Sequence, residues 1–197
     1  MPLAPLHFII GIEMVKSSLI GGIIVFTGLL WHGVGNAEKS VINPVEQSED
    51  QKVLVESAKC LALNMYYEAR NQGTAGVLAV TAVVLNRVND RRFPDTICGV
   101  IKQGPTRPSW KDKSKRFPVK HRCQFSWFCD GKSDNPKNKK EFDRYIEIST
   151  AILTGELPFI DITDGATFYH ADYVRPSWAR TKTRTIEIGD HIFYRWK

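Results

Sequence analysis

One segment of the chain is apolar on nearly every side of a helix. Residues 75–89, AGVLAVTAVVLNRVN, contain no acidic residue and one basic residue. A helix without a polar face is stable only when other elements cover it, so we expect this helix at the centre of the fold. Three of its alanines, Ala75, Ala79 and Ala82, lie along one stripe, and their small side chains let another backbone approach closely. Asn86 lies on the same stripe and is therefore expected to point into the domain.

Two further helices flank this segment in the sequence. The apolar spacing predicts one helix over residues 52–70. Another is predicted to begin at Asn135-Pro136, a cap followed by proline, and to end at Gly155. We therefore expect these helices to form the core of the domain.

The last forty residues change to the alternating pattern of strands. Short β runs are predicted at residues 166–170, 183–188 and 191–195, and Gly189-Asp190 is a two-residue hairpin signal between the last two. We therefore expect an α+β fold, in which a helical core carries a small C-terminal three-stranded antiparallel sheet.

The first 37 residues are set apart from this domain. An apolar run of twelve, residues 19–30, follows Lys16 and precedes the small residues Gly35-Asn36-Ala37. This pattern is typical of an export signal. Residues 14–37 are expected to be a cleaved signal peptide; a retained signal-anchor and a buried core helix are the alternatives.

The domain boundaries follow from this pattern. Residues 1–37 are the signal or anchor, residues 38–51 lack an apolar period and indicate a linker, and residues 52–197 form the folded domain. We expect an exported monomer of the periplasm or cell envelope that meets the membrane only through its N-terminal segment.

Four cysteines lie in the folded domain: Cys60, Cys98, Cys123 and Cys129. An even number behind an export signal favours disulfides, and four cysteines allow three pairings. A short loop makes Cys123 with Cys129 plausible, which leaves Cys60 with Cys98. The C-x5-C spacing is not that of a zinc site, so neither a metal nor another cofactor is expected.

The charge of the chain suits a polyanionic partner. Twenty-seven basic and 21 acidic residues give a formal charge of +6. Residues 102–122 alone hold eight basic residues and one acidic residue, with Trp110 and Phe117 among them. This segment is read as a long loop that either captures an anionic polymer or is simply solvated. No nucleic-acid-binding motif is visible, so nucleic acid is not the expected partner.

A carboxyl group at the end of the first helix is the strongest candidate for chemistry. Glu68 falls four residues after Asn64 and seven after Leu61, on a face that is partly buried, with Tyr67 beside it. Burial disfavours the charged form of a carboxyl and raises its pKa, as a general acid at a glycosidic oxygen requires. The alternative is a surface glutamate paired with Arg70.

Several segments resemble the SleB/CwlJ family of cell-wall hydrolases. They are MYYEARNQGTAGVLAVTAVVLNRVNDRRFPDTICGVIKQ, CQFSWFCDG, GATFYHAD, PSW and IGDHIFY, in order along the domain. The resemblance implies a lysozyme-like, lytic-transglycosylase-like catalytic domain that acts on the glycan strands of peptidoglycan. One departure is Asn71-Gln72, where relatives usually have Gly-Glu.

The resemblance also implies roles for individual residues. Glu68 corresponds to the catalytic glutamate, and Tyr67 beside it is expected to contact substrate. The remaining candidates for substrate binding are Gln124, Phe125 and Ser126 from one motif, and Tyr169, Trp178 and His191 from the C-terminal motifs.

The expected reaction is cleavage of the β-1,4 bond between N-acetylmuramic acid and N-acetylglucosamine. Glu68 would act alone as acid and then base, which gives a 1,6-anhydro product. The alternatives are a muramidase that uses water with a second carboxylate such as Asp130, a peptidoglycan-binding module without catalysis, and a Cys/His amidase or peptidase.

Overall fold

The computed structural model describes residues 48–197. The expected signal or anchor at residues 14–37 and the linker up to residue 47 lie outside this range. Within it, no helix has both the length and the hydropathy that a membrane span requires.

Helix α1 (Glu49–Ala69) begins three residues earlier than the sequence indicated, within the expected linker. The Ser48 side chain accepts a hydrogen bond from the backbone of Gln51, and two acidic residues occupy the first turn, where the helix dipole favours them. Further along, Leu61 and Met65 are fully buried. The C-terminal part of α1 therefore packs against the core, and Glu68 lies half-buried at its edge.

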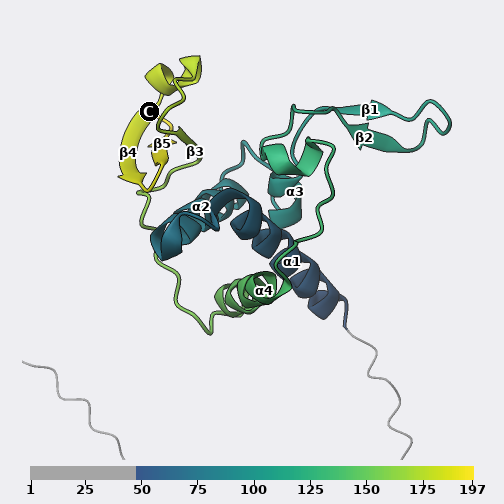
Figure 1. Cartoon of the computed structure of the whole chain (residues 1–197), viewed down its shortest axis with the longest axis horizontal. Helices are drawn as coiled ribbons and strands as arrows, with labels where there is room; N and C mark the ends of the chain where they lie inside the picture. The colour runs from purple at the N-terminus through teal and green to yellow at the C-terminus, as the bar shows by residue number, and fades with distance from the viewer. Residues whose placement is uncertain (1–47) are drawn as a thin grey trace, which may run out of the picture. The chain divides into compact units, whose positions relative to one another are not determined.

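Helix α2 (Gly73–Val88) is the central helix that its sequence predicts. Val80 and Val84 pack in the main core with α1 and with the short helix α3 (Ile97–Ile101), while Ala79 and Val83 pack against the C-terminal sheet. Figure 1 shows α2 between the sheet and the other helices. One expectation for its small-residue stripe is wrong: Ala75, in the exposed first turn, faces solvent.

Helix α4 (Lys139–Thr154) packs along α1. The predicted start at Asn135-Pro136 is wrong, because Asn138 provides the cap instead. Its side chain accepts a hydrogen bond from the backbone of Glu141 and donates one to the Glu141 carboxylate, an arrangement similar to a capping box. The predicted end is confirmed: Gly155 adopts a left-handed conformation with φ of 79°.

The C-terminal strands form the predicted antiparallel sheet in the order β3-β5-β4. Strand β3 (Phe168–Ala171) starts two residues later than expected, and β4 (Thr183–Ile188) and β5 (His191–Arg195) match the prediction. Gly189, in the turn between β4 and β5, has a φ of 57°. The α+β class and the three-stranded sheet are confirmed.

The side chain of Gln72 ties this sheet to the start of α2. Its amide oxygen accepts a hydrogen bond from the backbone of Asp190 at 2.9 Å, and its amide nitrogen donates one to the Asp190 carboxylate at 3.0 Å. A side chain at Gly189 would collide with Gln72. Gln72, which lies only four residues after Glu68 in the chain, therefore holds the hairpin turn in place.

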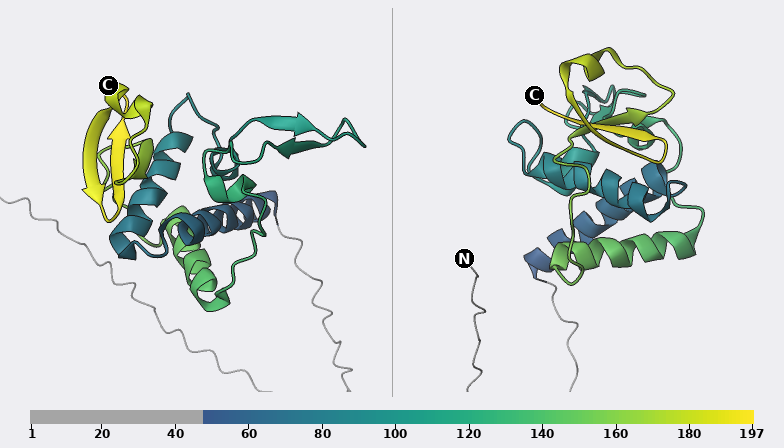
Figure 2. Two further views of the ribbon diagram at one scale, coloured as in Figure 1. Left: turned by 45° about the horizontal axis from the view of Figure 1, so that its top comes forward. Right: turned by 90° about the vertical axis from the view of Figure 1, so that its left-hand side faces the viewer.

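The basic segment 102–122 is not the single long loop that its sequence suggested. Strand β1 (Thr106–Pro108) pairs antiparallel with β2 (Arg116–Pro118), and the ribbon projects away from the helices in Figures 1 and 2. Two short 3-10 helices complete the fold: η1 (Ser126–Cys129) and η2 (Ser177–Thr181).

All four cysteines are paired, as Cys60–Cys98 and Cys123–Cys129. The first bridge joins α1 to α3 across 38 residues, and the second closes a loop of six residues around η1. The first of these bridges therefore holds together helices of the main core, and the second holds a local turn.

The lengths of the two closed loops predict unequal contributions to stability. Removing Cys60–Cys98 by paired alanine substitution should lower the free energy of unfolding by about 4 kcal/mol, and removing Cys123–Cys129 by about 2 kcal/mol, because the longer loop restricts the unfolded chain more. Urea denaturation of the two double variants measures both values. Equal losses, or a larger loss for the short loop, would contradict this assignment.

Candidate active site

Glu68 lies half-buried at the C-terminal end of α1, in the wall of an open cleft of about 400 Å³. The cleft is formed where α1 and α2 meet η1, β3 and η2. Its lining residues are Glu68, Arg87, Gln124, Phe125, Ser126, Phe168, Tyr169, Trp178 and Lys182. Six of the eight residues singled out in the sequence are thus brought together here from separate parts of the chain.

The hydroxyl of Tyr169 donates a hydrogen bond to Oε2 of Glu68 at 2.8 Å. This bond joins strand β3 to the end of α1 and fixes the orientation of the carboxyl group. Burial raises the pKa of Tyr169 well above 10.0, and the charge of Glu68 raises it further. Tyr169 therefore keeps its proton and remains a donor throughout the physiological range.

Opposing effects act on the pKa of Glu68. Burial raises it above its ordinary value of 4.5, while the hydrogen bond from Tyr169 and the positive charge of Arg87 lower it, and the net direction is upward. A raised pKa increases the protonated fraction of the carboxyl near neutral pH. Glu68 can therefore donate a proton to a bound group and take one back.

Three residues of this cleft were not singled out in the sequence, namely Phe168, Lys182 and Arg87, and Arg87 is the buried cation among them. Its side chain is 4% exposed, and its Nε donates a hydrogen bond to the backbone oxygen of Thr167 at 2.8 Å. The guanidinium lies 5.1 Å from the ring centre of Phe93 and 5.4 Å from that of Phe125. A basic residue in an otherwise apolar helix was the available signal, because a buried cation needs partners that stabilise it.

The motif Gln124-Phe125-Ser126 forms one wall of the cleft. Phe125 is 1% exposed and supports this wall from within the main core, so its side chain is chiefly a packing residue. The backbone of Gln124 donates a hydrogen bond to the backbone oxygen of Gln103 at 2.9 Å. Gln124 and Ser126 are the polar residues of this wall.

Trp178, on η2, lines the side of the cleft that the C-terminal sheet forms. Its ring centre lies 5.5 Å from that of Phe168 and 5.6 Å from that of His170, so it packs on the outer face of the sheet. Lys182 lines the same side, with its Nζ 3.6 Å from the ring centre of Trp196. This side therefore combines aromatic surface with a cation.

Two of the predicted residues do not line this cleft. His191 is buried behind Tyr169, with the ring centres 5.0 Å apart, and burial lowers its pKa. Tyr67 points into a neighbouring hollow of about 730 Å³, where its ring stacks on Trp127 with centres 4.9 Å apart. His191 is therefore placed to support Tyr169, and Tyr67 to offer an aromatic surface beside the cleft.

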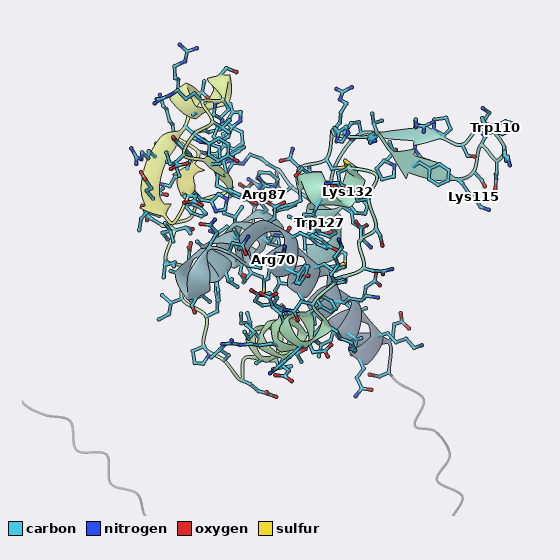
Figure 3. The ribbon with its side chains drawn as sticks, in the orientation of Figure 1. Arg70, Arg87, Trp110, Lys115, Trp127 and Lys132 are labelled. Carbon is cyan, nitrogen blue, oxygen red and sulfur yellow. A yellow bond between two sulfur atoms is a disulfide. The ribbon has the colours of Figure 1, made fainter. Side chains whose placement is uncertain are left out.

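The neighbouring hollow also contains Asp130 and Arg70. Trp127 at its edge is held by a hydrogen bond from its indole nitrogen to Asn64 of α1, and Figure 3 shows Trp127, Arg70 and Lys132 in one region of the molecule. Asp130 forms an ion pair with Lys132 at 3.7 Å. Asp130 thus lies in this hollow and does not line the cleft of Glu68.

Potential metal ligands gather at one point of the described chain. Glu56 lies close to Cys60 and Cys98. These two cysteines form a disulfide, which leaves no thiolate to bind a metal ion. This group is therefore read as a structural crosslink beside an exposed carboxylate.

A half-buried carboxyl that faces an open, aromatic-walled cleft is the arrangement of a general acid-base catalyst. The chain belongs to the Cell Wall Hydrolase family, whose match covers residues 71–194, more than half of the sequence. The matched range begins three residues after Glu68. The expected resemblance to the SleB/CwlJ hydrolases is confirmed.

Curated relatives support the same family. The chain is 28% identical over 163 residues to a spore cortex-lytic enzyme of Halalkalibacterium halodurans, covering 80% of this chain and 38% of the relative. It is 25% identical over 161 residues to a spore cortex-lytic enzyme of Oceanobacillus iheyensis, and the match covers 82% of this chain and 49% of the relative. The chain thus spans less than half the length of either relative.

Solved structures share the fold. The catalytic domain of the germination-specific lytic transglycosylase SleB from Bacillus anthracis matches with a TM-score of 0.50 and 25% identity, covering 78% of this chain and all of that domain. The catalytic domain of the Bacillus cereus SleB protein matches with a TM-score of 0.50 and 24% identity, and the match covers 83% of this chain and all of that domain.

The raised pKa of Glu68 predicts how stability depends on pH. The Glu68 carboxyl binds its proton more tightly in the folded protein than in the unfolded chain. Protonated Glu68 therefore contributes its full stabilisation below the pKa that Glu68 has in the unfolded chain. This contribution is lost as the pH rises through the pKa that Glu68 has in the folded protein. Glu68→Gln should therefore melt at a higher temperature than the parent at pH 8 and at nearly the same temperature at pH 4. A variant that is less stable at pH 8 would contradict the burial argument.

Proposed function

We propose that this domain cleaves the glycan strands of peptidoglycan between N-acetylmuramic acid and N-acetylglucosamine, with Glu68 as the single acid-base group. The observation that carries the proposal is the position of Glu68 in an open cleft, hydrogen-bonded to Tyr169 and with a raised pKa. Among the described residues that line this cleft, Glu68 is the one carboxylic acid.

The chemistry follows from one carboxyl acting twice. Protonated Glu68 gives its proton to the glycosidic oxygen, the bond from that oxygen to C1 of the muramoyl residue breaks, and the N-acetylglucosamine end leaves as an alcohol. The C6 hydroxyl of the same muramoyl residue then attacks C1, and the Glu68 carboxylate takes its proton. A 1,6-anhydro ring forms, no water is consumed, and Glu68 is protonated again.

The surroundings of Glu68 suit both halves of this cycle. Burial favours the protonated acid at the start, while Tyr169 and the positive charge of Arg87 stabilise the carboxylate that forms when the bond breaks. The aromatic surface of Trp178 and the polar groups of Gln124 and Ser126 are suited to a sugar ring and its hydroxyls. The names of the similar structures, which include a lytic transglycosylase, support the same class of reaction.

A muramidase that uses water is the second candidate. It would need a carboxylate to activate that water. Asp130 is the candidate that the sequence offered, and it lines the neighbouring hollow, where it forms an ion pair with Lys132. The single-carboxyl cycle therefore fits the cleft better.

Replacing the acid tests the assignment directly. Glu68→Gln should reduce the release of soluble muropeptides from purified sacculi by about a hundredfold or more, the range for loss of a general acid. Glu147→Gln, at an exposed position of α4, is the matched control and should retain full activity. Activity that survives in Glu68→Gln would overturn the assignment of Glu68, and an inactive parent would favour a binding module.

Tyr169→Phe should change both the rate and its dependence on pH. Loss of the hydrogen bond to Glu68 removes an effect that lowers the pKa of this carboxyl, so the alkaline limb of the activity profile should move to higher pH. The maximal rate should fall about tenfold, because a hydrogen bond to a charged group is lost. A reduced rate with an unmoved alkaline limb would show that Tyr169 does not tune Glu68.

A further inference from the structure

The ribbon of residues 106–118, hereafter the arm, projects from the domain without a covering element. Figures 1 and 2 show it extending away from the helices, and Figure 3 places Trp110 and Lys115 at its far end. The side chain of Trp110 is 78% exposed. A large aromatic ring held in water at the end of a projecting ribbon marks an interaction surface rather than a packing residue.

The arm is strongly basic. It contains five basic residues and one acidic residue, a formal charge of +4 on thirteen residues. Lys115 pairs with Asp112 at 3.6 Å, whereas Lys111 and Lys113 have no ion-pair partner among the described residues. Their charges are therefore available to a partner.

Hydrogen bonds give the end of the arm a defined shape. The backbone of Ser109 donates to the backbone oxygen of Lys115 at 2.8 Å, and the Asp112 carboxylate accepts from both the backbone and the hydroxyl of Ser114. The Nζ of Lys111 lies 5.2 Å from the ring centre of Trp110. The indole ring and the lysines are thus presented together.

The base of the arm is joined to the wall of the cleft. The backbone oxygen of Gln103 accepts the hydrogen bond from Gln124, and Gly104 packs so closely on Cys123 that a Cβ would lie 3.0 Å from its Cα. Since Gln124 lines the cleft of Glu68, the arm rises from the same wall. A polymer bound to the far end of the arm is therefore tethered to the domain through the wall that carries Gln124.

We propose that the arm is an accessory binding site for an anionic glycan, namely a peptidoglycan strand with its carboxylate-bearing peptides. The indole face of Trp110 stacks on a sugar ring, and Lys111 and Lys113 bind carboxylates of the peptides. This inference rests on the proposed function, because it names the polymer on which the cleft acts as the ligand of the arm.

The chemistry of the turn favours a glycan over an anionic lipid surface. A loop that enters a membrane places apolar groups at its tip, because charged groups are costly to bury there. The turn that follows Trp110 is Lys111-Asp112-Lys113-Ser114, which holds three charged residues and no apolar one. Such a turn suits a hydrated, anionic polymer.

Binding to sacculi, measured by co-sedimentation at 0.1 M salt, tests the proposal. Trp110→Ala should weaken binding about tenfold, and so should a triple variant with glutamine at Lys111, Lys113 and Lys115, because each exposed contact is individually weak. A control triple variant loses the same charge from exposed lysines elsewhere, at Lys52, Lys59 and Lys140, and should bind within about twofold of the parent. Thermal melting checks that every variant is folded.

Raising the salt separates the two contributions. The defect of the triple variant should shrink at 0.5 M salt, because the distance over which exposed charges interact falls from about 10 Å at 0.1 M salt towards about 3 Å at 1 M. The defect of Trp110→Ala should persist, since stacking depends little on salt. With sacculi as substrate, both arm variants should raise KM and leave kcat unchanged.

Unchanged sacculus binding by both arm variants would overturn the proposal. If Trp110→Ala then weakened binding to phosphatidylglycerol vesicles instead, the arm would be assigned to a lipid surface. Failure of the proposed function is separate, because the parent would then bind sacculi without releasing muropeptides.

Discussion

The hydrogen bond from Tyr169 to Glu68 spans 101 positions of the sequence and joins the two halves of the domain. Glu68 belongs to the last turn of α1, and Tyr169 belongs to the first strand of the C-terminal sheet. The carboxyl is half-buried only because the sheet, η1 and α2 surround the end of α1. Its raised pKa is thus a property of the assembled domain and not of the helix that carries it.

The rest of the fold holds this junction in place. One side of helix α2 packs on α1. Another side packs on the sheet, where Ala79 and Val83 contact the fully buried Phe193. Gln72 holds the β4–β5 turn by two hydrogen bonds. Gln72, at a position where the sequence was expected to depart from the family pattern, therefore has a structural role in this chain.

The sequence predicted the elements whose patterns are local. The apolar period of α2, the alternation of β4 and β5 and the turn at Gly189-Asp190 each leave a direct signal, and so does the position of Glu68 on its helix. The family resemblance added five further residues of the cleft: Gln124, Phe125, Ser126, Tyr169 and Trp178. The start of α4 was misplaced because Asn135 and Asn138 are both plausible caps, and tertiary contact decides between them: the backbone of Asn138 donates to the Tyr66 hydroxyl. Arg87 was missed because the burial of a cation depends on aromatic rings outside its own helix: Phe93 nearby, and Phe125 and Phe168 from distant segments.

We propose that Glu68 completes the reaction without a second carboxylate. Mass spectrometry of muropeptides released from sacculi in 18O-labelled water tests this most directly. The released anhydro-muramoyl ends should carry no label and should be lighter by one water than hydrolysed ends. Labelled reducing ends on muramic acid would contradict it, because they would show that water, activated by another group, attacks C1.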